Sequence, residues 1–119
     1  MNLIVWADIP VKDLKRASEF YAHVTGAPAT VMPGTTDVAV IGGPESGVSA
    51  DLYVGGTPSH DGPTIYLGSG GDIDGMVARV VEAGGKVLAD KAFMGDMVGW
   101  IAFVEDTEGN RIGIQQPAE

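Results

Sequence analysis

The sequence predicts an α+β domain made of two similar βαβββ modules, and two observations carry this prediction. First, a helix-like segment begins at Asp13 and stops at Gly26, and a second begins at Asp72 and stops at Gly85, so both span 13 residues and lie 59 residues apart. Second, one apolar, strand-like run precedes each helix and three follow it. Such internal repetition indicates a duplicated unit. At 119 residues, the chain has the size of one compact domain.

The first module (residues 1–54) opens with an alternating run, Leu3–Ile9, that is rich in β-formers and predicts a strand. Alternation places Trp6 and Asp8 on one face of this strand, opposite to the face that carries Ile9. We expect Pro10 to end the strand, because proline has no backbone N–H to offer a sheet.

A helix is expected over residues 13–25. Asp13 can cap its N-terminus, and Gly26 can end it because glycine readily adopts the left-handed conformation found there. Apolar residues recur along one face, as in a helix that packs on a sheet: Leu14, Ala17, Phe20, Tyr21 and Val24. Glycine and proline then separate three short strands, expected over Ala29–Met32, Asp37–Ile41 and Val48–Val54.

Residues 55–63 contain three glycines and two prolines and are interpreted as a linker. The second module (residues 64–119) repeats the pattern, with a strand over Thr64–Gly68 and a helix near Ile73–Ala83. Three strands are expected after it, over Lys86–Asp90, Gly99–Glu105 and Arg111–Gln116. Residues 107–110 predict a tight hairpin turn between the last two strands.

Composition excludes several classes of function. The net charge of −9 argues against binding to nucleic acids and anionic membranes, which require clustered Lys and Arg. The chain has no cysteine, so disulfides, thiolate nucleophiles and cysteine-based zinc sites are excluded. No apolar run approaches the length of a membrane span, and the first residues lack the pattern of a signal peptide. A cytoplasmic protein is therefore expected.

Three segments resemble a known family: Ile9–Leu14 with the helix that follows, Gly70–Asp74 with Ala83–Val87, and Phe103–Gly113. In order and spacing they resemble the vicinal oxygen chelate superfamily, which includes glyoxalase I, bleomycin-resistance proteins and extradiol dioxygenases. The resemblance implies two βαβββ modules whose mixed, curved sheets form a cup. It does not fix one activity, because the fold hosts isomerases, dioxygenases, epimerases and drug-binding proteins.

Enzymes of this family hold a divalent metal in the cup through His, Glu or Gln at four strand positions. The resemblance places the first position at Trp6 and the last at Gly113, and the 59-residue offset gives Ile65 and Val54 for the others. None of these side chains offers a metal donor, and the residues next to them supply no His or carboxylate. We therefore expect no metal and no cofactor.

We expect the cup to bind a small organic ligand instead. Its expected lining residues are Trp6, Asp8, Trp100, Phe103, Arg111 and Gln115. Trp100 and Phe103 lie on opposite faces of one strand, so only one of them can face the cup. A flat indole, a carboxylate and the negative net charge favour a neutral or cationic ligand touching Trp6, Asp8 and Gln115. Arg111, however, could neutralise Asp8 or select an anion.

Three functions stay open at this point. The first is a metal-free small-molecule binder, such as an antibiotic-sequestering protein. The second is an enzyme, either cofactor-free through Asp8 or metal-dependent through unconventional donors, namely Asp8, Asp51, His60 and Gln115. The third is an interaction module whose cup is filled. The loop Lys91–Gly99, with Met94 and Met97, is interpreted as an adaptable lid or as a loosely packed segment. A homodimer is expected, because a small domain with exposed sheet edges gains from pairing.

Overall fold

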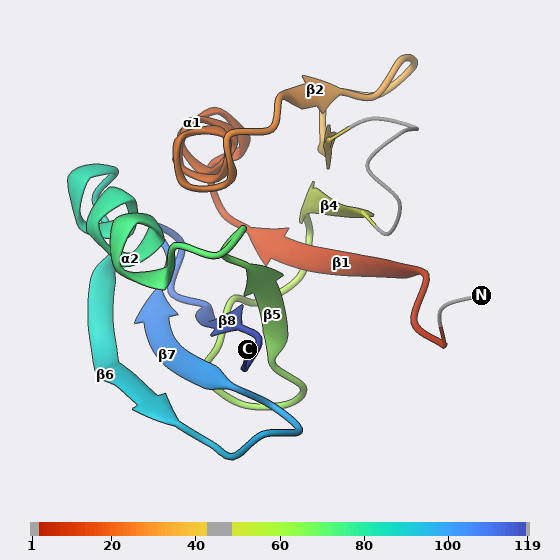
Figure 1. The fold of residues 1–119 in the computed structure, drawn as a ribbon. Helices are drawn as coiled ribbons and strands as arrows, with labels where there is room; N and C mark the ends of the chain where they lie inside the picture. Colours follow the sequence, from red (N-terminus) through yellow and green to blue (C-terminus); the bar gives the residue numbers. More distant parts are fainter. Residues whose placement is uncertain (1–2, 43–48, 119) are drawn as a thin grey trace.

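Each half of the chain folds into one strand, one helix and three further strands (Figure 1). This computed structural model describes residues 3–42 and 49–118. The first module contains β1 (Trp6–Val11), α1 (Leu14–Thr25), β2 (Ala29–Val31), β3 (Val38–Ile41) and β4 (Ser49–Val54). The second contains β5 (Ile65–Gly68), α2 (Ile73–Glu82), β6 (Lys86–Phe93), β7 (Trp100–Glu105) and β8 (Arg111–Gln116).

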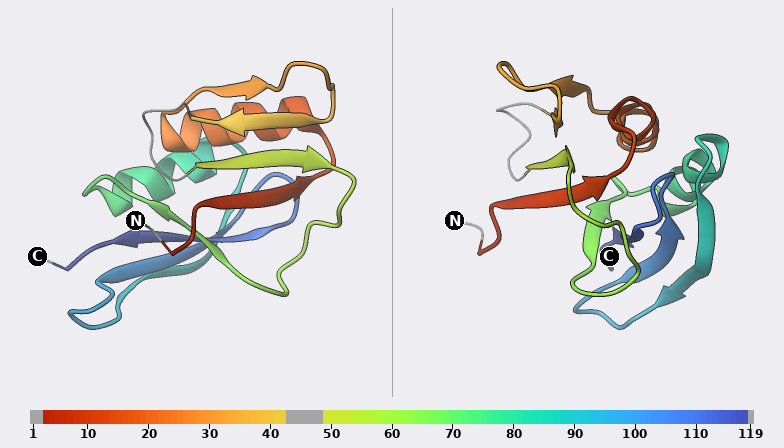
Figure 2. Two further views of the ribbon diagram at one scale, coloured as in Figure 1. Left: turned by 90° about the vertical axis from the view of Figure 1, so that its right-hand side faces the viewer. Right: turned by 180° about the vertical axis from the view of Figure 1, so that it is seen from behind.

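The two sheets have the same topology. Their strand orders are β1-β4-β3-β2 and β5-β8-β7-β6. In each sheet the first and last strands of the module pair in parallel, and the other neighbours pair antiparallel. Both sheets are thus mixed, open and curved (Figure 2). The expected α+β fold of two βαβββ modules is confirmed.

The helix ends follow from local chemistry. The Asp13 side chain accepts a hydrogen bond from the backbone N–H of Arg16, and α1 ends at Gly26, whose φ of 74° is left-handed. In the second module, Asp72 caps α2 in the same way by accepting from the N–H of Gly75. The cap at Asp13 agrees with the sequence prediction, and the second helix starts at Asp72 as the sequence indicated.

The two helices lie side by side, and each covers one face of its own sheet (Figure 1). Their apolar faces and the covered sheet faces form one continuous core that includes Phe20 and Tyr21 of α1 and Met76 of α2. The helices therefore leave the opposite face of each sheet uncovered. We call these the first and second open faces, and they carry the candidate site. Neither helix in the described parts of the chain is long and apolar enough to cross a membrane.

The first strand differs from the prediction. β1 begins at Trp6 and continues through Pro10 to Val11, whereas the sequence suggested Leu3–Ile9. Proline is tolerated because β1 is an edge strand that pairs only with β4. The Pro10 carbonyl, on the unpaired edge, accepts a hydrogen bond from Asn110 Nδ2 at 2.8 Å. A missing N–H on that edge therefore costs no sheet hydrogen bond.

Smaller differences occur elsewhere. β6 extends to Phe93 rather than ending at Asp90, with irregular pairing to β7 along the way. Residue Val48, at the expected start of β4, lies outside the described residues, and the described strand begins at Ser49. The hairpin turn over residues 107–110 is present, and the Asp106 carboxylate holds it by accepting hydrogen bonds from three consecutive backbone N–H groups.

Candidate functional site

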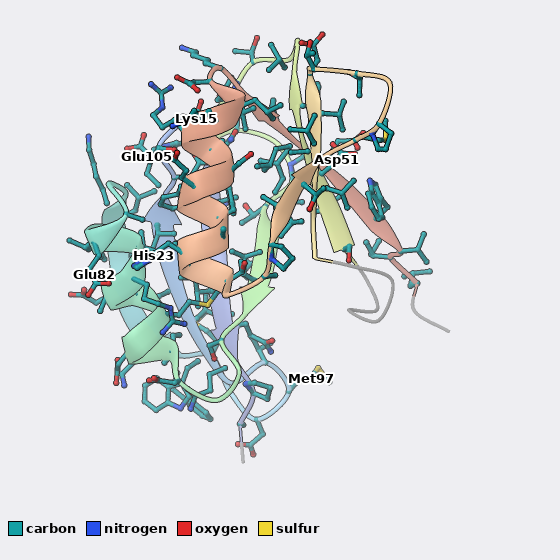
Figure 3. The ribbon with its side chains drawn as sticks, turned by 90° about the horizontal axis from the view of Figure 1, so that it is seen from above. Lys15, His23, Asp51, Glu82, Met97 and Glu105 are labelled. Atoms are coloured by element: carbon teal, nitrogen blue, oxygen red, sulfur yellow. The ribbon has the colours of Figure 1, made fainter. Side chains whose placement is uncertain are left out.

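The first open face carries an aromatic residue and two carboxylates. Trp6 and Asp8 project from β1, and the parallel register places Asp8 opposite Asp51 of β4. The indole Nε1 of Trp6 donates a hydrogen bond to Asp51 Oδ2 at 2.9 Å. Burial raises the pKa of Asp51, and the neighbouring charge of Asp8 adds to that rise, while the Trp6 hydrogen bond opposes it. Figure 3 shows Asp51 on the sheet of the first module, away from His23 and Glu82, which meet between the helices.

The second open face is mainly aromatic. Tyr66 of β5 and Phe103 of β7 pack edge to face, with ring centroids 6.0 Å apart. The Arg111 guanidinium lies 5.0 Å from the centre of the Phe103 ring. One of its nitrogens, Nη2, donates to Thr64 Oγ1 at 2.6 Å. Gln115 lies on the same face, because it follows Arg111 on β8 with the same strand parity. The prediction that Arg111 and Gln115 lie on one face, with Ile112 and Ile114 buried against the helices, agrees with the structure.

The choice between Trp100 and Phe103 is decided by strand alternation. Trp100 packs against the core beneath α2, where it contacts Phe93 and lies 5.2 Å from the Lys91 ammonium. Phe103 projects to the opposite side, next to Tyr66. Of the two aromatic residues, Phe103 therefore lies on the second open face, and Trp100 lies on the helix side.

The metal positions expected from the 59-residue offset need a correction. Ile65 packs against the core, and Val54 has the same parity as the buried Leu52, so neither belongs to an open face. The offset fails because 59 is odd. Open-face residues of the two modules, such as Asp8 and Tyr66 or Asp51 and Gly113, lie an even number of residues apart, so an odd offset moves each position to the opposite face of its strand.

The remaining residues do not fit a divalent metal. A side chain at Gly113 would overlap the ring of Tyr66, so the ring occupies the space that a ligating side chain would need. Within residues 3–42 and 49–118, no group of three or more His, Cys, Asp or Glu residues is placed to hold a metal ion. The side chains that the described residues place at the expected metal positions therefore cannot supply the donors of the family's metal centre.

The unconventional donors are also held in different places. Asp8 and Asp51 face each other on the first sheet. His60, however, lies 3.1 Å from Glu105 at the end of β7, and Gln115 donates its amide to the carbonyl of Val98 at 2.7 Å. These four side chains do not converge on one point.

In the described parts of the chain, three of the cavities are lined by residues expected at the site, and a further cavity lies between the two helices. An apolar cavity of about 470 Å³ is lined by Tyr66, Met94, Val98, Ile101, Phe103 and Gln115. A polar cavity of about 250 Å³ includes Asp8, Thr57, Ser59, Asp61, Asn110 and Arg111 among its lining residues. A third, of about 570 Å³, separates β1 from β5 and contains Trp6. The six residues expected to share one cup are therefore distributed, and their contact with a ligand stays a prediction.

The loop between β6 and β7 covers one side of the apolar cavity. Met94 and Val98 contribute to the lining, whereas Met97 is 98% exposed and projects from the loop (Figure 3). The hydrogen bond from Gln115 Nε2 to the Val98 carbonyl ties this loop to β8. Met94 therefore lies at the cavity and Met97 does not, and whether this loop acts as a lid stays a prediction.

One set of important residues was not anticipated from the sequence. Glu108, in the predicted hairpin turn, has a side chain that is 0% exposed and reaches the first module. It accepts hydrogen bonds from the backbone N–H groups of Lys12 and Asp13 and from the Arg16 guanidinium. Nearby, the Tyr21 hydroxyl donates to Asp106. Only the apolar surroundings of Tyr21 hinted that its hydroxyl would require a buried partner.

Comparison with known proteins agrees with this geometry. A family model described as the Glyoxalase/Bleomycin resistance protein/Dioxygenase superfamily matches residues 3–114. Among curated proteins, none matches the sequence.

Several solved structures share the fold. A glyoxalase/bleomycin resistance protein from Albidiferax ferrireducens T118 is 18% identical, with a TM-score of 0.76, covering 95% of this chain and 97% of that one. A domain of the same description from Frankia sp. EAN1pec is 21% identical, with a TM-score of 0.73 and coverage of 100% and 94%. The fosfomycin resistance protein FosX of Listeria monocytogenes, as an E126Q mutant complexed with Mn(II) and 1S,2S-dihydroxypropylphosphonic acid, is 12% identical, with a TM-score of 0.70 and coverage of 99% and 92%.

Proposed function

Because this chain belongs to the glyoxalase/bleomycin resistance protein/dioxygenase superfamily, we propose that it binds a small organic molecule without a resident divalent metal. The fold supports this proposal by retaining two open sheet faces. The side chains support it because Gly113, at one expected metal position, is covered by the ring of Tyr66. Catalysis through a metal on this face would require donors that the described residues do not bring together.

The observation that carries the proposal is the apolar cavity on the second open face. Its volume of about 470 Å³ lies in the range typical of small-molecule sites. Two aromatic rings, Tyr66 and Phe103, form one wall, and Met94, Val98 and Ile101 supply flexible and branched aliphatic surface. The Tyr66 hydroxyl and the Gln115 amide are the polar groups among these residues. This combination suits a flat apolar molecule that makes few directional contacts.

Binding is favoured over catalysis by what lines this cavity. Among its six lining residues, the Tyr66 hydroxyl is the only group that can act as a general base or nucleophile, and no carboxylate, imidazole, serine or lysine accompanies it. The nearest candidate base from the sequence analysis, Asp8, lines the separate polar cavity. The structure therefore gives stronger support to a ligand-binding role than to the enzyme alternative.

The test compares two aromatic residues of the same strand. Phe103→Ala removes part of the cavity wall, whereas Trp100→Ala removes an aromatic ring of similar burial from the opposite face of β7. Binding of the neutral probe 3-phenylpropionamide is measured by ligand-observed NMR, after circular dichroism has shown that each variant is folded. We expect Phe103→Ala and Tyr66→Ala each to weaken binding by roughly tenfold and Trp100→Ala to leave it unchanged. Equal binding to all three variants would place the site elsewhere.

We also propose that the chain forms a homodimer. Leu3, Ile4 and Val5 are exposed next to β1, and the edge strands β2 and β6 carry further exposed apolar side chains such as Val31 and Phe93. Adjacent apolar residues on the surface of a small domain are typical of an interface. A second copy of the chain could cover them and protect unpaired strand edges at the same time.

A further inference from the structure

The small polar cavity between β1, residues 57–63 and β8 contains opposite charges that do not neutralise each other. Asp8 and Asp61 contribute carboxylates to its wall, and Arg111 contributes a guanidinium. Among the described residues, no carboxylate oxygen lies within 4.0 Å of an Arg111 nitrogen. Lys12 and Arg79 likewise have no such partner within this part of the chain, whereas Arg16, Lys15, Lys86 and Lys91 do. The hydroxyl-bearing residues Thr57 and Ser59 line the same space.

Arg111 is fixed in position by contacts that, among residues 3–42 and 49–118, give its charge no carboxylate partner. Its Nη2 donates to the neutral hydroxyl of Thr64, and its guanidinium carbon lies 5.0 Å from the centre of the Phe103 ring. Its Nε is buried and makes no hydrogen bond within the part of the chain that the structure describes. A partly buried cation held in this way has lost some of its hydration without gaining a counter-ion. An anionic group entering the cavity would supply one.

The carboxylates on the other side of the cavity would be stabilised by a positive charge. Asp8 faces Asp51 across the parallel pair of β1 and β4, so two like charges lie next to each other. A cation beside Asp8 would relieve their repulsion. Asp61 adds a second carboxylate on the linker side of the same cavity, which Asp51 does not line.

We propose that this cavity binds a zwitterionic head group, an ammonium and a carboxylate separated by a short link as in an α-amino acid. The ammonium lies beside Asp8 and the carboxylate beside Arg111. This inference rests on the proposed function, because the rest of the ligand occupies the apolar cavity. Phe103 lies between the two cavities, because its ring lines the apolar cavity and also contacts the guanidinium of Arg111. The ligand class is therefore a small amino acid with an aromatic or branched apolar side chain.

The test uses four probes that share a phenyl ring on a two-carbon unit and differ in the charged groups attached to it. They are L-phenylalanine, 3-phenylpropionate, phenethylamine and the neutral 3-phenylpropionamide. Affinity is measured at neutral pH by isothermal titration calorimetry or, for weak binding, by ligand-observed NMR. Since each charge-assisted contact strengthens binding, we expect L-phenylalanine to bind roughly tenfold or more tightly than each of the other three.

Two substitutions test the carboxylate and the ammonium of the head group independently. Arg111→Gln is expected to weaken binding of L-phenylalanine and 3-phenylpropionate but to preserve that of phenethylamine. Asp8→Asn is expected to weaken binding of L-phenylalanine and phenethylamine but to preserve that of 3-phenylpropionate. Lys15→Gln and Asp90→Asn are the matched controls, because they change the net charge equally at exposed positions away from the cavity.

The outcomes distinguish this proposal from the one on which it rests. If the neutral probe binds but L-phenylalanine gains nothing over it, the apolar cavity stands and the zwitterion site is refuted. If 3-phenylpropionate binds as tightly as L-phenylalanine, the cavity selects anions and the role of Asp8 is refuted. If none of the four probes binds, both proposals fail together.

Discussion

The ring of Tyr66 lies directly against the α-carbon of Gly113, its neighbour in the parallel pairing of β5 and β8. A β-carbon on residue 113 would overlap the ring atoms Cδ2 and Cε2. Glycine at position 113 thus leaves room for the ring of the half-exposed Tyr66, and the aromatic platform of the second open face depends on this contact.

Gly113→Ala should therefore force the Tyr66 ring out of position. We expect a loss of about 1–3 kcal/mol in the free energy of unfolding, the usual cost of overpacking, measured by urea denaturation. Gly68→Ala is the control, because a β-carbon at Gly68 meets no atom within 4 Å. In the Tyr66→Ala background the cost of Gly113→Ala should shrink, since the clashing ring is absent. An unchanged cost in that background would contradict the packing argument.

The contact between Tyr66 and Gly113 also predicts the metal content of the purified protein. With Tyr66 filling the space beside Gly113, purified protein is expected to retain well under one equivalent of Zn, Ni, Fe or Mn after dialysis. Elemental analysis of the dialysed protein measures this. A value near one equivalent would overturn the metal-free proposal and favour the enzyme alternative.

Glu108 should dominate the acid sensitivity of the fold. Burial on its own would raise its pKa, but hydrogen bonds from Arg16, Thr107 and two backbone N–H groups outweigh burial and lower the pKa from 4.5 to about 2. Because the folded-state pKa is depressed, the stabilisation is complete above the unfolded pKa near 4.5 and is lost as the pH falls towards 2. The shift corresponds to about 3 kcal/mol.

Glu108→Gln should remove this component. Unfolding free energies measured between pH 5 and pH 2 are expected to depend less steeply on pH in the variant than in the parent protein. Glu19→Gln, which alters an exposed carboxylate on α1, should retain the parent slope. If both variants follow the parent, Glu108 is not the group that titrates.

Substitutions of two residues on the first open face, Asp8 and Trp6, are expected to shift the pKa of Asp51 in opposite directions. Asp8→Asn should lower the pKa of Asp51 by removing a neighbouring negative charge, whereas Trp6→Phe should raise it by removing a hydrogen bond to the ionised carboxylate. Carboxyl ¹³C NMR titrations measure both shifts. Since the folded-state pKa of Asp51 is raised, its ionisation costs stability as the pH rises through that range, and Asp8→Asn should recover part of the cost at neutral pH. Shifts of the same sign in both variants would refute this account.

The proposed dimer can be tested at the exposed N-terminal segment. Val5→Glu places a charge among the exposed residues 3–5 and should shift the equilibrium towards monomer in sedimentation velocity experiments. Val81→Glu, at an exposed position of α2, should leave the dimer intact. A parent protein that sediments only as a monomer at high micromolar concentration would rule out the proposal.

The sequence by itself determined the architecture. Helix caps at Asp13 and Asp72, the stop at Gly26 and the apolar periodicity are local signals, and they located both helices and most strands within one or two residues. Strand alternation also placed Trp6 and Asp8 together, and Arg111 with Gln115, because side-chain direction reverses at every residue. These properties depend on neighbours in the chain.

Only the tertiary structure decided how the site is composed. The pairing of Asp8 with Asp51 and of Tyr66 with Gly113 depends on register between strands more than 40 residues apart, and the longer strands β6 and β7 increase that separation in the second module. The burial of Glu108 against α1 depends on how the two modules pack together. Such contacts are fixed by packing and hydrogen bonding in three dimensions, for which a single sequence holds no local signal.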